Sequence, residues 1–168
     1  MGLENAALQH VMMAGIELRE REPLAEHTSM RVGGPARWMA FPKTVAEVQT
    51  LLCAAQEVGV PIRLLGAGTN VLAPDAGVEA LVICLKDALT GLQICGTDRL
   101  MAMAGETLSR TAVFARKHAL RGLEFAHGIP GTVGGGIFMN AGAYGGELRQ
   151  TVETVTFLHM DGKLETLD

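Results

Sequence analysis

The sequence has little positive charge, few cysteines and no long apolar run, and each shortage excludes a class of protein. The 14 Lys and Arg residues stand against 18 Asp and Glu residues, and no basic block could neutralise a row of phosphates. We therefore expect no nucleic-acid partner. No apolar stretch approaches the length of a membrane span, and the N-terminus lacks the basic and apolar regions of a secretory signal. We expect a cytoplasmic protein without a membrane partner.

Cysteine and histidine residues are too scattered to suggest a disulfide or metal framework. The three cysteines are widely spaced among apolar neighbours, which favours buried reduced thiols over disulfides or a zinc site. They are Cys53, Cys84 and Cys95. The histidines show no ligand spacing either, so we expect no metal.

Glycine, by contrast, is abundant, with 21 residues against one Trp, one Tyr and five Phe. The glycines are clustered, and strongly apolar segments lie between the clusters, which favours shaped backbone turns over a flexible low-complexity chain. Hydrophobic residues fill 48% of the 168 positions, enough for the core of one ordinary domain or of two small subdomains.

The first half of the sequence predicts a βαβ–β unit. Apolar residues at helical spacing predict a short helix over residues 5–16, and the run ARWMAFP predicts a strand. Thr44 and Glu47 match the T-x-x-E capping box that begins a helix, and Gly59 followed by Pro61 would end that helix. The runs IRLLG and ALVICL predict two more strands, the second covered on both faces.

The second half predicts two hairpins, one helix and a long glycine-rich segment. LQICG and RLMAMAG flank residues 96–98 as a hairpin, and residues 107–119 predict a helix closed by Gly122. Residues 122–146 hold too many glycines over too great a length for a tight turn. Asp161-Gly162 predicts a final hairpin with a type I′ turn.

These elements divide the chain into three parts. Residues 1–23 form an N-terminal helical segment, residues 24–88 a first subdomain and residues 89–168 a second one. No Ser- or Pro-rich linker separates the last two, so the boundary is a seam between subdomains.

The loop LLGAGTNVL, residues 64–72, is the first candidate for a ligand site. Gly66 and Gly68 follow an apolar strand and allow positive φ and close approach to a ligand, while Thr69 and Asn70 add side-chain donors. The loop is neither a Walker A motif nor a dinucleotide fingerprint, because the residues that complete those motifs are missing. Taken alone, a strand-exit turn without ligand remains the simpler interpretation.

The segment HGIPGTVGGGIFMNAGAYGG, residues 127–146, favours a ligand. Its glycines would leave a run of backbone amides without side-chain cover, Thr132 adds a hydroxyl and Pro130 stiffens the start. The glycines meant here are Gly131, Gly134, Gly135 and Gly136. Such density costs folding entropy, which contact with a phosphate-bearing ligand would offset. With few cations available, amide dipoles would hold a diphosphate. Close packing of one backbone over another is the alternative.

Together with HTSMRVGGPA at residues 27–36, these segments resemble the UDP-N-acetylenolpyruvoylglucosamine reductases, the MurB family of peptidoglycan precursor synthesis. That family shows N-T-x-x-R-x-G-G-x-A, G-x-G-S-N-x-L and G-I-P-G-[ST]-x-G-G…N-[AI]-G-A-Y-G in this order, and the match extends over residues 24–158. His27 replaces the usual Asn, Thr69 the usual Ser, and Gly136 a common Ala.

The resemblance implies an α+β fold, the two-subdomain FAD-binding fold of the PCMH/vanillyl-alcohol-oxidase type, with non-covalent FAD between the subdomains. The diphosphate would lie on the first loop and the flavin region on the second segment. The cofactor-binding residues it implies are Leu65, Gly66, Ala67, Gly68, Thr69, Asn70, Val71, Gly128, Ile129, Pro130, Gly131, Thr132, Val133, Gly134, Gly135, Asn140, Gly142 and Ala143. Tyr144 and Arg31 would face the substrate. Backbone could instead satisfy the Tyr144 hydroxyl, and a carboxylate could pair with Arg31.

The family's reaction implies two small-molecule partners besides FAD. NADPH reduces the flavin, and the flavin passes the hydride to the enolpyruvyl double bond of a UDP-sugar. The family's catalytic Arg, Ser and Glu lie beyond the last residue here, as does its C-terminal substrate-binding domain. We therefore expect no catalytic residue within this chain and an inactive fragment, and apolar surface bared by the truncation would be open to self-association.

Two other classes stay open. The chain could belong to a related FAD-dependent oxidase or dehydrogenase of the same fold, in which His127 is the one residue near the loops that could attach the flavin covalently. It could also be an interaction domain that keeps the fold without the cofactor.

Overall fold

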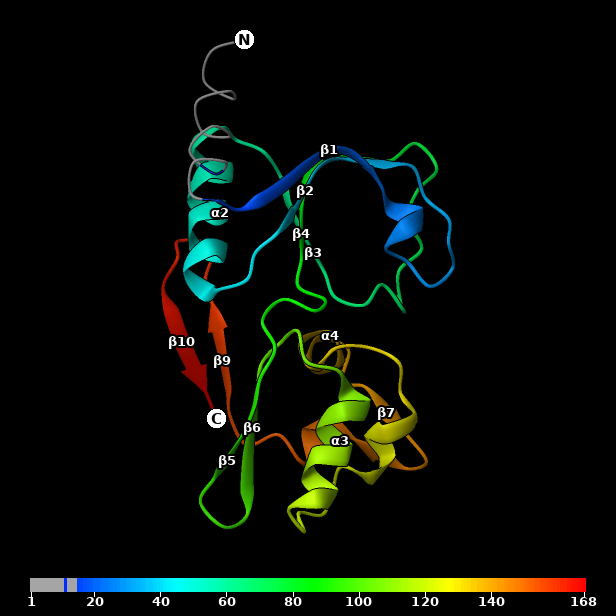
Figure 1. The fold of residues 1–168 in the computed structure, drawn as a ribbon, viewed down its shortest axis with the longest axis vertical. Helices are drawn as coiled ribbons and strands as arrows, with labels where there is room; N and C mark the ends of the chain where they lie inside the picture. Colours follow the sequence, from blue (N-terminus) through cyan, green and yellow to red (C-terminus); the bar gives the residue numbers. More distant parts are fainter. Residues whose placement is uncertain (1–10, 12–14) are drawn as a thin grey trace.

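A computed structural model describes Val11 and residues 15–168, arranged as two lobes (Figure 1). The first lobe holds β1 (Glu17–Pro23), η1 (Leu24–Glu26), β2 (Pro35–Phe41), α2 (Val45–Glu57), β3 (Ile62–Leu65) and β4 (Val78–Cys84). Its strands form one sheet in the order β1-β2-β4-β3, with β2 and β3 parallel to β4 and β1 antiparallel to β2. The predicted βαβ–β unit is thus confirmed. The helix predicted over residues 5–16 lies almost entirely outside the described residues.

Strand β1 corrects the sequence prediction, because residues 17–23 were assigned to a helical segment and form an edge strand instead. The sequence ELREREP lacks the alternation of apolar and polar residues that marks a strand with one buried face, and most of its residues are exposed. The strand forms because it pairs antiparallel with β2, from Glu17 opposite Phe41 to Pro23 opposite Pro35. Pairing with a neighbouring strand, not hydrophobic periodicity, determines this element.

Helix α2 begins as its capping residues predict. The Thr44 side chain accepts a hydrogen bond from the Glu47 amide, and the Glu47 carboxylate accepts one from the Lys43 amide, one residue before the cap. The helix ends at Glu57, after which Gly59 adopts a φ of +67°. The chain can therefore turn back into β3 without a strained side chain.

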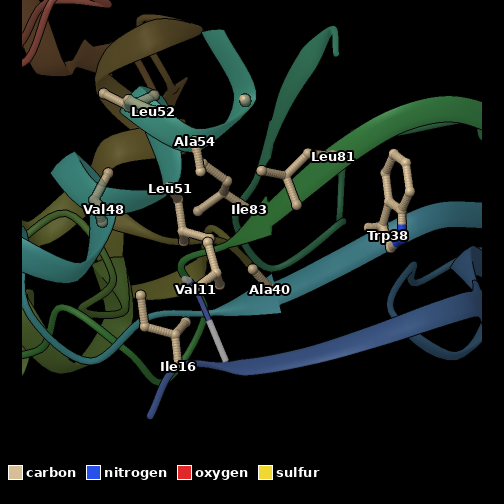
Figure 2. Close-up of a cluster of buried hydrophobic side chains, with 11 residues drawn as sticks. Val11, Ile16, Trp38, Ala40, Val48, Leu51, Leu52, Ala54, Leu81 and Ile83 are labelled. Carbon is tan, nitrogen blue, oxygen red and sulfur yellow. The ribbon is translucent and has the colours of Figure 1, made fainter. Parts of the chain in front are cut away.

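The core of the first lobe lies on both faces of the sheet. On one face α2 packs its buried stripe, centred on Leu51, against Ile83, and Leu81 and Trp38 belong to the same cluster (Figure 2). On the other face Met39 and Val82 pack together with Leu65. Successive residues of β4 thus point to opposite cores, which confirms the prediction of a strand covered on both sides.

The second lobe consists of short elements around a smaller core. It holds β5 (Leu92–Cys95), β6 (Arg99–Ala102), α3 (Leu108–Lys117), η2 (Glu124–Gly128), α4 (Val133–Phe138), β7 (Gly142–Ala143), β8 (Gly146–Glu147) and η3 (Leu148–Gln150). The hairpin of β5 and β6 and the helix α3 confirm their predictions. Helix α3 ends two residues earlier than predicted. Ala119 is the first residue after it with positive φ, and Gly122, the residue expected to close the helix, has positive φ three residues later.

The last hairpin, β9 (Val155–Leu158) with β10 (Leu164–Leu167), returns to the first lobe and lies beside α2 (Figure 1). Gln49 and Gln56 of α2 donate side-chain hydrogen bonds to the carbonyls of Gly162 and Met160. The connection runs over residues 159–163 with positive φ at Gly162 alone. A type I′ turn needs two such residues in succession, so that detail of the prediction is wrong.

The cysteines also depart from expectation. Only Cys84 is buried, and burial raises the pKa of its thiol. Cys53 and Cys95 are exposed. All three are free thiols, as predicted.

Candidate functional site

The two glycine-rich segments, far apart in sequence, meet where the lobes face each other. The Thr69 hydroxyl donates a hydrogen bond of 3.0 Å to the carbonyl of Pro130. Gly66 lies so close to the second segment that a Cβ there would come within 2.5 Å of the Thr132 hydroxyl oxygen. The expectation that both segments form one site therefore has a geometric basis.

A group of backbone amides at this junction has no partner. Within the described part of the chain, the amides of residues 66–70 donate no hydrogen bond, and neither do those of Gly131 and Thr132. The first segment follows β3. Ser29 holds its backbone in place, because the Gly68 carbonyl accepts hydrogen bonds from the Ser29 amide and hydroxyl. Adjacent unpaired amides of this kind bind anions.

The rest of the second segment does not provide amides as the sequence suggested. The Val133 amide donates to the Glu106 carbonyl, and the Gly134 amide to the Ala104 carbonyl. The Gly135 amide donates to the hydroxyl of Thr132, which caps α4, and the Gly136 amide donates to the Thr132 carbonyl. The expectation of free amides at Gly134, Gly135 and Gly136 is wrong, because these residues form a helix.

Gly68 and Gly134 are required to be glycine for a reason other than the expected space for a ligand. A Cβ on Gly68 would come within 2.1 Å of the His27 carbonyl oxygen, and the residue holds φ at +64°. A Cβ on Gly134 would meet the Ala104 side chain at 3.0 Å. Both positions face neighbouring protein, so neither glycine is required in order to leave space for a ligand.

Asn140 and the residues after it form a small hairpin at the edge of the second lobe. The Asn140 side chain donates to the Glu147 carboxylate and accepts from the Arg149 amide, so it stabilises this hairpin. Gly142 and Ala143 form β7, and Tyr144 follows with φ of +53° and a side chain 97% exposed. A tyrosine in this conformation is strained, and within the described residues nothing satisfies its hydroxyl.

Charge is absent from the junction itself. Residues 64–72 and 128–135 contain no acidic, basic, histidine or cysteine side chain. Arg31 has a φ of +54° and an exposed side chain that pairs with no carboxylate of the described chain, which removes the carboxylate alternative for that part of the protein. His127 is the last residue but one of η2 and is exposed. The anion-binding capacity of the junction thus rests on amide dipoles.

The structure also reveals contacts near the site that the sequence did not predict. Residues 27–31, here termed the strap, belong to the first family motif and run directly over the Gly66–Asn70 loop through His27 and Ser29. Glu106 is 1% exposed behind the second segment, where one carboxylate oxygen pairs with Arg110 and the other has no partner among the described residues. The motif marked the strap but not its contact with the loop, and no motif included Glu106.

Ligand atoms that could hold a metal converge at one place among the described residues. Glu22, Glu26 and His27 bring theirs within 4.8 Å of one another. Burial alone would raise the pKa of Glu22, but hydrogen bonds from His27 and Arg19 outweigh it and lower that pKa below its usual value. Glu22 is therefore already paired within the protein.

Comparison with known proteins identifies the relatives of the chain. A family model described as FAD binding domain matches residues 36–168. The UDP-N-acetylenolpyruvoylglucosamine reductase of Limosilactobacillus fermentum is 45% identical over 152 residues, which make up 90% of this chain and 50% of that protein. The chain spans about half the length of the curated relatives it matches.

Solved structures give the same result for the fold. UDP-N-acetylenolpyruvylglucosamine reductase (MurB) from Thermus caldophilus superposes with a TM-score of 0.68 at 31% identity, over 90% of this chain and 52% of that one. Glucooligosaccharide oxidase from Acremonium strictum superposes with a TM-score of 0.69 at 14% identity, over 99% of this chain and 36% of that one. At this low identity the match shows the fold alone. The expected α+β FAD-binding fold of the PCMH/vanillyl-alcohol-oxidase type and the resemblance to MurB are confirmed. No described helix is long and apolar enough to cross a membrane.

Proposed function

The chain belongs to the family of FAD binding domains, whose model covers residues 36–168, and from this membership we propose that it holds FAD as the FAD-binding portion of a UDP-N-acetylenolpyruvoylglucosamine reductase. The observation that carries the proposal is the junction of the two glycine-rich segments, where the unpaired amides of residues 66–70 lie beside those of Gly131 and Thr132.

The residues present fit the diphosphate of FAD. Seven backbone amides that have no partner among the described residues provide donors, and no carboxylate in either segment would repel the phosphates. The Thr69–Pro130 hydrogen bond sets the distance between the two groups of donors. The junction itself, residues 64–72 and 128–135, contains no histidine or cysteine that could bond the flavin, which supports non-covalent binding; His127 is the one histidine in either segment.

The other positions implied by the resemblance remain part of the proposal. Val133, Gly134 and Gly135 would contact the cofactor through their Cα surfaces, since their amides are bonded elsewhere. Asn140, by holding its hairpin, would place Tyr144 on the substrate side.

The activity of the whole protein is proposed from its relatives. FAD supplies the hydride-transfer chemistry when bound, and the protein binds and orients it. We propose NADPH as the reductant and a UDP-N-acetylglucosamine enolpyruvate as the substrate, in cytoplasmic peptidoglycan precursor synthesis that supports cell-wall growth, cell shape and division. The chain spans about half the length of its curated relatives, and the part that we propose for these 168 residues is to bind and orient FAD.

The test is a titration of the purified chain with FAD. We expect a flavin absorbance spectrum that stays with the protein on gel filtration and intact FAD in the supernatant after acid precipitation. Colour that remains in the pellet would indicate a covalent link and favour the oxidase class. A folded chain that retains no FAD at any concentration would leave only the interaction-domain alternative.

A further inference from the structure

We propose that His27, paired with Glu22, is a positioning residue for the cofactor loop: the pair holds the strap of residues 27–31 against Gly66–Asn70, and so determines how tightly the chain retains FAD. The inference rests on the proposed function, because it assumes that this loop binds the cofactor. It concerns a residue that touches the loop through the backbone and not the cofactor itself.

The strap and the loop are in direct contact. The His27 carbonyl lies so near Gly68 that only a glycine fits beneath it, at 2.1 Å from an added Cβ. Ser29 donates from its amide to the Gly68 carbonyl at 3.1 Å. Thr28, buried between them, closes the strap with a hydrogen bond from its hydroxyl to the Val32 carbonyl. A displacement of the strap would therefore displace the loop and its unpaired amides.

The side chain of His27 anchors the strap to the sheet. Its Nε2 lies 2.8 Å from a Glu22 carboxylate oxygen, and both side chains are mostly buried, at 19% and 12% exposure. The ring packs on Phe41 with centroids 5.6 Å apart. Since Glu22 stands on β1 and Phe41 on β2, the pair connects the strap to two strands of the sheet. Partly buried, hydrogen-bonded pairs of this kind contribute more to the stability of the fold than exposed pairs do.

The charges around the pair keep its carboxylate ionised. Arg19 donates to Glu22 at 2.7 Å, and the Glu26 carboxylate lies within 4.8 Å of the same group of atoms. The hydrogen bonds from His27 and Arg19 keep the pKa of Glu22 low despite its burial, so Glu22 stays charged at neutral pH. Glu22 thus presents a charged acceptor to the His27 ring, and a hydrogen bond to a charged acceptor is stronger than one between neutral groups.

The experiment measures the dissociation constant of FAD at neutral pH for the wild type and for three variants. His27→Ala and Glu22→Ala should each weaken binding about tenfold, the loss of one charge-assisted hydrogen bond. His27→Gln keeps a side-chain donor for Glu22, and should retain most of the wild-type affinity. Equal losses in His27→Gln and His27→Ala would contradict the role of this hydrogen bond.

A matched control is present in the same chain. His159 pairs with Glu165 on the last hairpin, away from both cofactor segments. His159→Ala should leave the affinity for FAD unchanged. An effect of His159→Ala equal to that of His27→Ala would overturn the inference, because it would show that the loss of any His–Glu pair weakens FAD binding.

Amide hydrogen exchange gives a readout that does not depend on FAD. In His27→Ala the Ser29 amide, which donates to the Gly68 carbonyl, should exchange faster than in the wild type, while the amides of α3 should not change. A wild type that binds FAD and variants that bind it equally well would overturn the inference alone. A wild type that binds no FAD would overturn the proposed function and the inference with it.

Discussion

Replacing Gly68 with alanine tests whether contact with the strap, and not space for a ligand, requires a glycine in the loop. Two costs follow from the structure. The residue holds φ at +64°, which costs a side-chain-bearing residue about 1–2 kcal/mol. The new Cβ would also lie 2.1 Å from the His27 carbonyl oxygen, and relieving such an overlap costs about 1–3 kcal/mol. We expect the free energy of unfolding of the FAD-free protein to fall by about 2–5 kcal/mol.

Gly59→Ala is the matched control for this prediction. Gly59 has nearly the same φ, +67°, but an added Cβ meets nothing within 4 Å, and the residue lies after α2 on the way to β3. Gly59→Ala should therefore lose only the conformational part, about 1–2 kcal/mol. Urea unfolding of both variants without FAD gives the difference directly. If Gly68→Ala is no less stable than Gly59→Ala, the strap contact is not what constrains the loop.

Three further predictions address the site, the core and the acid range. Gly128→Ala should leave stability unchanged, because its Cβ meets no atom within 4 Å, and should weaken FAD binding in a titration; unaltered affinity would remove Gly128 from the site. Leu51→Ala should cost about 2–5 kcal/mol in urea unfolding, whereas Leu164→Ala, 58% exposed, should stay within about 0.5 kcal/mol. The pKa of Glu22 is lowered in the folded state, so its stabilisation is present above pH 4.5 and is lost as the pH falls through the folded value. As the pH is lowered, the free energy of unfolding should fall less steeply in Glu22→Gln than in the wild type. An equal slope in both proteins would contradict the lowered pKa of Glu22.

Local signals in the sequence predicted the elements that local interactions determine. The capping pattern of Thr44 and Glu47 placed the start of α2, because one side chain and one amide three residues apart are sufficient to begin a helix. The run ALVICL placed β4, because every residue of a strand covered on both faces must be apolar.

The elements that the sequence did not reveal depend on contacts distant along the chain. Strand β1 has an almost wholly charged sequence and forms through its ladder with β2. Helix α4, VGGGIF, contains three glycines that disfavour helix. Thr132 caps it locally, but its packing depends on Gly136, which lets the distant Leu108 and Leu148 lie against its backbone. Neither contact leaves a periodic pattern in the sequence.

The same distinction explains why the site was located from the sequence but its donors were assigned only in part. A high density of glycine has two physical causes: amides left open to a ligand, and backbone brought close to another segment. The first cause applies at residues 66–70, 131 and 132, whose amides have no partner in the described chain. The second applies at Gly134 and Gly136, where the amides are bonded and an added Cβ would meet a neighbouring side chain. Both causes apply at Gly66, which brings the first lobe against Thr132 while its own amide stays open. Counting glycines cannot separate these cases, whereas the partner of each amide does.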